Sequence, residues 1–319
     1  MDLYPCTFQP IYLSKIWGGR NLHRLFGRAL PPRQAIGESW ELADLPAGVS
    51  VVAAGPLAGT SLTELTRLWG PSLLGEARPM PDGRFPLLLK LLDANDILSL
   101  QVHPDAAAAA AIGGGAAMKT ECWYVIESRG GMTYKGLRPG VTPEQLRQAI
   151  ETNTAEQVVQ PVPVKVGDFL YLPAGTVHAL GAGVVVAEIQ TPSNTTYRVT
   201  DWGRGREVHV EQAMRCIHFA PSADRPPGRR GSTLLATEFF QVARRLTRTR
   251  QEVPLPPGRC TAVMVVAGRT AEVRHEGQVQ PITKLRAGET VLLPARLRKP
   301  VLHTGGMCRW LEITLPEAP

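Results

Sequence analysis

The stretch VGDFLYLPAGTVH at residues 166–178 matches AGETVLLPARLRK at residues 287–299 without a gap. Each copy has a glycine and an acidic residue, then a short apolar strand, then Leu-Pro-Ala. Earlier in each half, TECWYV at 120–125 matches TAVMVV at 261–266. Self-similarity of this kind indicates a structural unit that occurs more than once. The sequence therefore predicts two copies of one β-fold.

Short β-rich segments, separated by turns that contain glycine or proline, make up most of the remaining chain. That density of short strands is typical of an antiparallel sandwich or barrel. Helical signals are few: segments 61–74, 105–112 and 142–151 each open on a serine, aspartate or threonine suited to cap a helix. We expect a mainly β fold with a few short helices inserted in the first copy.

The length of 319 residues favours two domains. The segment ADRPPGRRGS at 223–232 is rich in proline, glycine and arginine, which indicates a linker. We therefore predict one domain over residues 1–222 and a second over residues 233–319.

Composition is that of an ordinary globular chain, with 44% apolar and 20% charged residues. No apolar run approaches the roughly 20 residues that span a bilayer, and the N-terminus lacks the layout of a signal peptide. The cysteines are scattered without a CxxC pair, which suits a reducing compartment. We expect a cytoplasmic protein with no membrane partner, acting as a monomer or homodimer.

The formal charge of +7 raises the question of an anionic partner. The arginine-rich pieces at 225–230, 243–250 and 295–299 carry no interleaved aromatic residues of the kind that stack on single-stranded bases. We therefore expect no nucleic-acid partner. Attraction of a small anionic substrate is the alternative use of this charge.

The segment SLQVHPD at 99–105 predicts a strand with an unusual polar face. Period-two alternation sends Ser99, Gln101 and His103 to one side and the two apolar residues to the other. Pro104 ends the strand because it has no N–H to donate. Side chains at i and i+2 point the same way, so Gln101 and His103 are able to reach one ion.

Glu121 and His178 lie on two further predicted strands of the first copy. Together with Gln101 and His103, these two residues form a set of N and O ligands that suits Zn²⁺, with Mn²⁺, Fe²⁺ or Co²⁺ as alternatives. A single histidine on a strand is more often a hydrogen-bonded core residue than a ligand. The second copy has Ala262 and Lys299 at the matching positions, and this joint loss favours a metal site in the first copy alone.

Several blocks, in the expected order across roughly residues 1–210, resemble the type I phosphomannose isomerases, in particular their short bacterial form. The blocks are KIWGG (15–19), GESWELAD (37–44), FPLLLKLLDA (85–94), LSLQVHPD (98–105), KTECWYV (119–125), LPAGTVHAL (172–180) and TYRVTDWGR (196–204). The combination of QVHP, KTECWY and PAGTVHAL is specific. The alanine tract at 106–111 and the short, arginine-rich second half depart from the usual pattern.

The resemblance implies a pair of cupin (jelly-roll) β-barrels, with one zinc ion in the first and no metal ligands in the second. The implied ligands are Gln101, His103, Glu121 and His178. The implied activity interconverts mannose 6-phosphate and fructose 6-phosphate through a cis-enediol, so the expected partner is a phosphorylated hexose. Arg198 matches the catalytic arginine of the family.

Four other residues are candidates for the reaction. Lys90 and Glu188 are charged residues within very apolar runs, where burial of a charge is costly. Lys119 lies two residues before Glu121 and hence on the same face, and Ser99 is suited to donate to phosphate.

We predict two sets of site residues from these arguments. The catalytic set is Arg198, Lys119, Glu188 and Lys90, and the substrate-binding set is Ser99, Lys119 and Arg198. Spacing alone does not choose the proton-transfer base among Lys90, Lys119 and Glu188.

Three other functions remain as alternatives. Iron-dependent cupin dioxygenases more usually carry a His-x-His pair, where this chain has Gln101 and His103. A non-catalytic sugar-binding cupin is favoured less because Arg198 and the lysines are present. An isomerase of another aldose fits almost equally well, since phosphate selection rests on one or two basic side chains.

Overall fold

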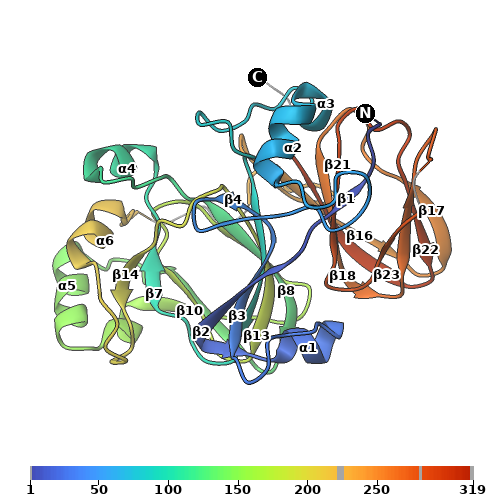
Figure 1. Cartoon of the computed structure of the whole chain (residues 1–319). Coiled ribbons are helices and arrows are strands. Elements are labelled where there is room, and N and C mark those ends of the chain that lie inside the picture. The colour runs from blue at the N-terminus through green and yellow to red at the C-terminus, as the bar shows by residue number, and fades with distance from the viewer. Residues whose placement is uncertain (1, 221–225, 280–281, 317–319) are drawn as a thin grey trace.

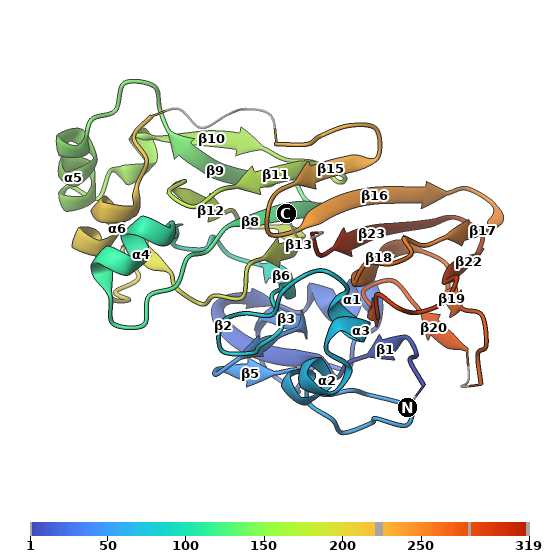
Figure 2. The ribbon, with the colours of Figure 1, turned by 90° about the horizontal axis from the view of Figure 1, so that it is seen from above.

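The computed structural model describes residues 2–220, 226–279 and 282–316. Its strands form two sandwich-like units, each with a six-stranded sheet and a smaller sheet (Figures 1 and 2). The predicted mainly β fold with short helices is therefore confirmed. No helix in the described part of the chain is long and apolar enough to cross a membrane.

The first unit contains the five-stranded first outer sheet and the six-stranded first inner sheet. The first outer sheet runs in the order β10 (Val159–Pro163), β9 (Met132–Leu137), β12 (His178–Leu180), β7 (Leu100–Val102) and β14 (Tyr197–Thr200). The first inner sheet runs in the order β11 (Phe169–Leu172), β8 (Glu121–Ser128), β13 (Val184–Gln190), β6 (Leu88–Ala94), β3 (Ile36–Leu42) and β2 (Ile11–Gly19).

The second unit repeats this arrangement. The second inner sheet runs β1 (Cys6–Thr7), β21 (Thr290–Leu293), β18 (Thr261–Gly268), β23 (Cys308–Thr314), β16 (Gln241–Thr247) and β15 (Thr233–Ala236). The second outer sheet runs β17 (Arg250–Pro254), β22 (Val301–Gly305), β19 (Ala271–Arg274) and β20 (Thr283–Leu285). A short hairpin of β4 (Asp44–Leu45) and β5 (Gly48–Val49) stands apart.

The two inner sheets pack against each other through alternating apolar side chains. Leu89, Cys122 and Ile189 of the first inner sheet share one buried cluster with Met264 and Leu311 of the second. The opposite faces of these strands line the interiors of the two units. The first inner sheet is thus buried on both sides, and only one side is available for a site.

The first outer sheet is also covered on its outward face. Leu100 and Val102 of β7 pack in a cluster with Leu146 of α5 (Pro143–Glu151) and Ala213 of α6 (Val210–Cys216). The polar residues of the same segment therefore face the inside of the unit. Figure 1 shows α5, α6 and α4 (Ala106–Ile112) grouped at this end of the molecule.

The predicted helix caps are confirmed. Ser61 and Thr142 form capping boxes with Glu64 and Gln145, and the side chain of Asp105 accepts from the Ala108 N–H. The predicted helical segment 61–74 is divided at Gly70, which separates α2 (Leu62–Trp69) from α3 (Pro71–Leu74). Its φ of 45° belongs to the left-handed region that favours glycine. The helices α1 (Asn21–Phe26) and α6 and the 3₁₀ turn η1 (Ala155–Gln157) had no clear signal in the sequence.

Strand pairing corrects one detail of the internal repeat. Glu121 pairs with Leu172, whereas the corresponding Leu293 pairs with Thr261 and not with Ala262. The alignment of 120–125 with 261–266 is therefore wrong by one residue. A shift of one residue moves every side chain to the other face of a strand. The second unit still has no carboxylate at this position, because Thr261 takes the place of Glu121.

The division into domains at 222 and 233 remains a prediction. Residues 221–225 lie outside the described residues, and 226–232 form turns and an isolated bridge at Arg230. The N-terminal strand β1, however, pairs with β21 of the second inner sheet. The start of the chain thus completes a sheet of the second unit, although the predicted boundary assigned it to the first.

A largely buried arginine of the first unit, held by an ion pair, contacts the second unit. Arg28 contacts the Glu41 carboxylate at 2.6 Å and also donates to the carbonyl of Gly288 in the second unit. Its side chain is 13% exposed and that of Glu41 is 4% exposed. Because removal of one partner leaves the other buried without compensation, we expect Arg28→Met to lower the free energy of unfolding by about 3 kcal/mol.

Denaturant unfolding of the full chain measures this change. The matched control is Arg24→Met, because Arg24 is 45% exposed in its ion pair with Glu127 and should contribute about 1 kcal/mol or less. Equal, small losses in the two variants would contradict the role assigned to Arg28.

Candidate metal centre

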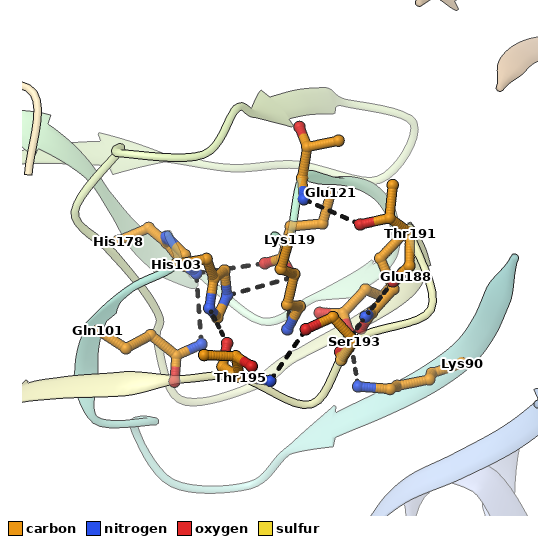
Figure 3. Close-up of polar contacts among 12 residues, drawn as sticks. Lys90, Gln101, His103, Lys119, Glu121, His178, Glu188, Thr191, Ser193 and Thr195 are labelled. Carbon is orange, nitrogen blue, oxygen red and sulfur yellow. Dashed lines mark hydrogen bonds and ion pairs between the residues drawn. The ribbon is translucent and has the colours of Figure 1, made fainter. Parts of the chain in front are cut away.

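The four predicted metal ligands converge between the two sheets of the first unit. His178 and Gln101 are directly opposite each other in β12 and β7, and His103 follows the end of β7. Glu121 begins β8 in the facing inner sheet. Figure 3 shows these side chains directed toward one point.

The distances among the ligand atoms are uniform. Glu121 Oε2 lies 3.4 Å from His103 Nε2, and Glu121 Oε1 lies 3.2 Å from His178 Nε2. The amide nitrogen of Gln101 is 3.3 Å from His178 Nε2. Ligands at about 2.0–2.1 Å from a tetrahedral ion are separated by about 3.3 Å. Rotation of the Gln101 amide exchanges its nitrogen and oxygen, so an oxygen ligand is equally accessible there.

The second nitrogen of each imidazole fixes its tautomer. His103 Nδ1 lies 2.9 Å from the Thr195 carbonyl oxygen, and His178 Nδ1 lies 2.9 Å from that of Thr176. A carbonyl only accepts, so each Nδ1 carries a proton, and in a neutral imidazole the Nε2 atom then presents its lone pair. Metal-bound histidines commonly have this outer hydrogen bond.

The charge states of the ligands also fit a metal. Burial, followed by the charge of Lys119, lowers the pKa of His103 to about 3, so its imidazole is neutral. Burial alone would raise the pKa of Glu121, but Lys119 and His103 outweigh it and hold that pKa well below the ordinary value. The neutral imidazole of His103 thus turns the lone pair of its Nε2 toward an ionised carboxylate, which is unfavourable unless a cation lies between them.

These residues therefore fit a metal ion. Among the residues that the structure describes, His103 Nε2 and both oxygens of Glu121 are buried without a conventional hydrogen bond, and their polar contacts are with each other, His178 and Lys119. In the described ranges, one group of three or more His, Cys, Asp or Glu side chains has metal-binding geometry, and it consists of His103, Glu121 and His178.

A cavity of about 470 Å³ opens beside this centre. It is lined by all five predicted catalytic and substrate-binding residues, Lys90, Ser99, Lys119, Glu188 and Arg198, and by the ligand Gln101. The structure thus brings the whole predicted set together, although it does not test the role of each residue.

Strand register places the charged residues of the first inner sheet in one row. Lys90 is directly opposite Glu188, which is opposite Trp123, and Trp40 is opposite Lys90 on the other side. Lys90 Nζ lies 3.0 Å from Glu188 Oε1, and the Trp123 indole donates to Glu188 Oε2 at 2.9 Å. Figure 3 shows Lys90 and Glu188 facing each other across this row.

Two residues that sequence reasoning missed extend the row. Glu38 lies 3.6 Å from Lys90 and 2.9 Å from Lys15, and accepts from the Trp40 indole at 2.8 Å. Glu38 and Lys15, the two residues that were missed, both line the cavity. They lie in the blocks KIWGG and GESWELAD, so the resemblance held a signal for them. Thr196 also lines the cavity and lies in the block TYRVTDWGR, whereas Arg206 and Asn194 line it and carried no such signal.

Lys90 keeps its proton at neutral pH. Burial alone would lower its pKa, but the carboxylates of Glu188 and Glu38 outweigh this and raise it above the ordinary value. Lys90 is therefore unsuited to be the proton-transfer base and is suited to orient Glu188.

Comparisons with known proteins identify the relatives of this chain. The model of the type I phosphomannose isomerase catalytic domain matches residues 6–126. A mannose-6-phosphate isomerase of Streptococcus mutans is 39% identical over 251 residues, which cover 73% of this chain and 78% of that protein. The mannose-6-phosphate isomerase ManA of Bacillus subtilis is 37% identical over 233 residues, covering 70% and 71%.

Solved structures give the same result. A mannose 6-phosphate isomerase from Bacillus subtilis aligns with a TM-score of 0.84 and 30% identity, over 97% of this chain and 99% of that one. A zinc-bound mannose 6-phosphate isomerase aligns with a TM-score of 0.78 over 98% and 99%, at 18% identity, and supports the fold alone.

The fold and the site together define a two-unit metalloenzyme of the cupin type. The chain belongs to the type I phosphomannose isomerase family, and its members are isomerases of a sugar phosphate. The predicted family, fold class and enzyme class are confirmed.

The row of charges predicts a pH dependence of stability. Burial alone would raise the pKa of Glu38, but Lys90 and Lys15 outweigh it and lower the pKa to about 2. Because the pKa of Glu38 is lower in the folded than in the unfolded protein, its carboxylate stabilises the fold at pH values above the unfolded-state pKa of about 4.3. This contribution to stability is lost as the pH falls toward 2.

Denaturant unfolding of the wild type and Glu38→Gln measures the effect. We expect a constant excess stability of the wild type between pH 7 and 5, which then shrinks steadily as pH falls to 3. The same comparison with Glu252→Gln is the control, since Glu252 is 71% exposed. An excess that is unchanged down to pH 3 contradicts the assignment.

Proposed function

We propose that the protein interconverts mannose 6-phosphate and fructose 6-phosphate, with one zinc ion per chain held by Gln101, His103, Glu121 and His178. The observation that carries the proposal is the set of buried ligand atoms that face one another, 3.2–3.4 Å apart, at the edge of a cavity that contains paired lysines and glutamates. The relatives named above support the substrate. A cytoplasmic location is part of this proposal, and the five cysteines, all free and buried, are consistent with it.

The reaction moves a proton between C1 and C2 of the open-chain sugar through a cis-enediol. It requires a base, stabilisation of the enediolate charge and an anchor for the phosphate. When bound, the ion supplies Lewis-acid stabilisation of negative charge on the sugar oxygens.

Glu188 is the proton carrier in this proposal. Its carboxylate lines the cavity and accepts hydrogen bonds from Lys90 and the Trp123 indole, which fix its orientation. Lys119 lies 2.9 Å from Glu121 as an ammonium group and is placed to bind sugar oxygens. Arg198, whose Nε has no hydrogen-bond partner among the described residues, is available to substrate oxygens.

The first test is conversion of mannose 6-phosphate to fructose 6-phosphate by the purified full chain. We expect activity to be lost on chelation and restored by Zn²⁺, with about one ion per chain by elemental analysis. Protein that holds one ion per chain and leaves this substrate untouched contradicts the proposal. Turnover of a different aldose in that case would support the alternative isomerase.

The second test is Glu188→Gln. Loss of a positioned base should reduce kcat by about 10²–10⁴-fold, and exchange of the C2 hydrogen of mannose 6-phosphate with deuterated solvent should fall in parallel. Metal content should stay at the wild-type level. Glu252→Gln in β17 is the control. Exchange that continues at the wild-type rate in Glu188→Gln assigns the base elsewhere.

A further inference from the structure

The cavity has five cationic side chains, and they differ in how their charge is compensated. Lys15, Lys90 and Lys119 each lie within 3.0 Å of a carboxylate of the site, those of Glu38, Glu188 and Glu121 respectively. The remaining two are Arg198 and Arg206, which belong to the segment 198–206. The cations of the cavity that have no ion pair with a carboxylate of the site are therefore the two arginines of this segment.

Arg206 is held in place by a carboxylate from outside the cavity. Its Nε donates to Asp201 Oδ2 at 2.9 Å, and Nη2 contacts Asp201 Oδ1. Asp201 is 3% exposed and also accepts from Arg204 at 2.9 Å. One negative charge thus serves two guanidinium groups. The Arg206 side chain is 29% exposed and borders the cavity.

Hydrogen bonds attach this loop beside Ser99. The Trp202 indole donates to the Leu98 carbonyl at 2.6 Å, and Arg204 donates to the Ile97 carbonyl at 2.6 Å. Leu98 and Ser99 both line the cavity. The loop therefore brings Arg206 to the part of the cavity wall that contains the Ser99 hydroxyl.

Arg198 reaches the same region from β14, which pairs with β7. Burial lowers the pKa of Arg198, and the nearby positive charge of Arg206 lowers it further. Its guanidinium has no carboxylate partner among the described residues: Nη1 donates to the Glu207 carbonyl, and the buried Nε has no partner. Two like charges that face one cavity are favourable when a dianion lies between them.

We propose that Arg206, oriented by Asp201, binds the phosphate of the substrate together with Ser99 and Arg198, and so sets the preference for a phosphorylated over a neutral sugar. This inference rests on the proposed function. A guanidinium matches phosphate oxygens in a fixed planar geometry, which a carboxylate on its far side makes more rigid. Asp201 is a positioning residue, because it acts through Arg206.

The test is steady-state kinetics of zinc-loaded Arg206→Gln. Loss of one charge-assisted contact of about 1.5–3 kcal/mol should raise KM for mannose 6-phosphate and the inhibition constant of inorganic phosphate by about 10–100-fold, with a much smaller change in kcat. Arg206→Lys should recover part of the phosphate affinity because it keeps the charge. Asp201→Asn should raise KM less than Arg206→Gln.

Arg244→Gln is the matched control, since Arg244 is an exposed arginine of β16 in the second unit. Circular dichroism and metal content verify that each variant is folded and loaded. A fall in kcat with KM and phosphate inhibition unchanged overturns the proposal, as does a variant with unchanged kinetics.

Calorimetric titration with inorganic phosphate separates this inference from the proposed function. If the wild type binds phosphate and Arg206→Gln binds it at least 10-fold more weakly, the anion site stands even without isomerase activity. Equal binding by both proteins, or no binding by either, overturns the site, although mannose 6-phosphate turnover by the wild type would still support the isomerase.

Discussion

The face-to-face packing of the two inner sheets is the constraint on which the site depends. Leu91, Tyr124 and Ala187 of the first inner sheet point into this interface, while Lys90, Trp123 and Glu188, their neighbours along the same strands, point into the first unit. Because successive side chains of a strand point to opposite faces of the sheet, the packing of one set fixes the direction of the other. The second unit therefore has a physical role of its own, because it covers the back of the sheet that carries the charged row.

Burial of this many charges is costly, and the site compensates by pairing them. Lys119 lies against Glu121, and Lys90 lies between Glu188 and Glu38. Breaking any such pair leaves an uncompensated charge at low dielectric. The same pairing keeps Lys90 protonated, which is why Glu188 is the proton carrier in the proposed function. Stability and chemistry are therefore set by one network, which extends to the surface at Lys15.

Sequence reasoning pointed to the candidate ligands because part of their pattern is local. Polar residues at i and i+2 of one strand, and charges within apolar runs, are visible without a structure. The helix caps at Ser61, Asp105 and Thr142 were equally local. Sequence reasoning failed where the strand register decides which residues of the two units correspond. Strand pairing shows that Thr261, and not Ala262, replaces Glu121 in the second unit. Similarity between two apolar segments does not fix this register. The pairing of β1 with β21 is a contact between distant segments that no local pattern encodes.

The sequence by itself determined the β-rich class and the repeat, and it predicted the four candidate ligands and four of the charged residues that line the cavity, namely Lys90, Lys119, Glu188 and Arg198. Only the tertiary structure decided which charges pair, which tautomer each histidine adopts through the Thr195 and Thr176 carbonyls, and which cations remain for an anion. Arg206 illustrates the difference, because in the sequence it is one arginine among many. It becomes a candidate for phosphate binding only in the structure, where Asp201, Trp202 and Arg204 fix its loop beside Ser99. The physical reason is that alternation and capping act over a few residues, whereas ion pairing depends on distances between segments far apart in the chain.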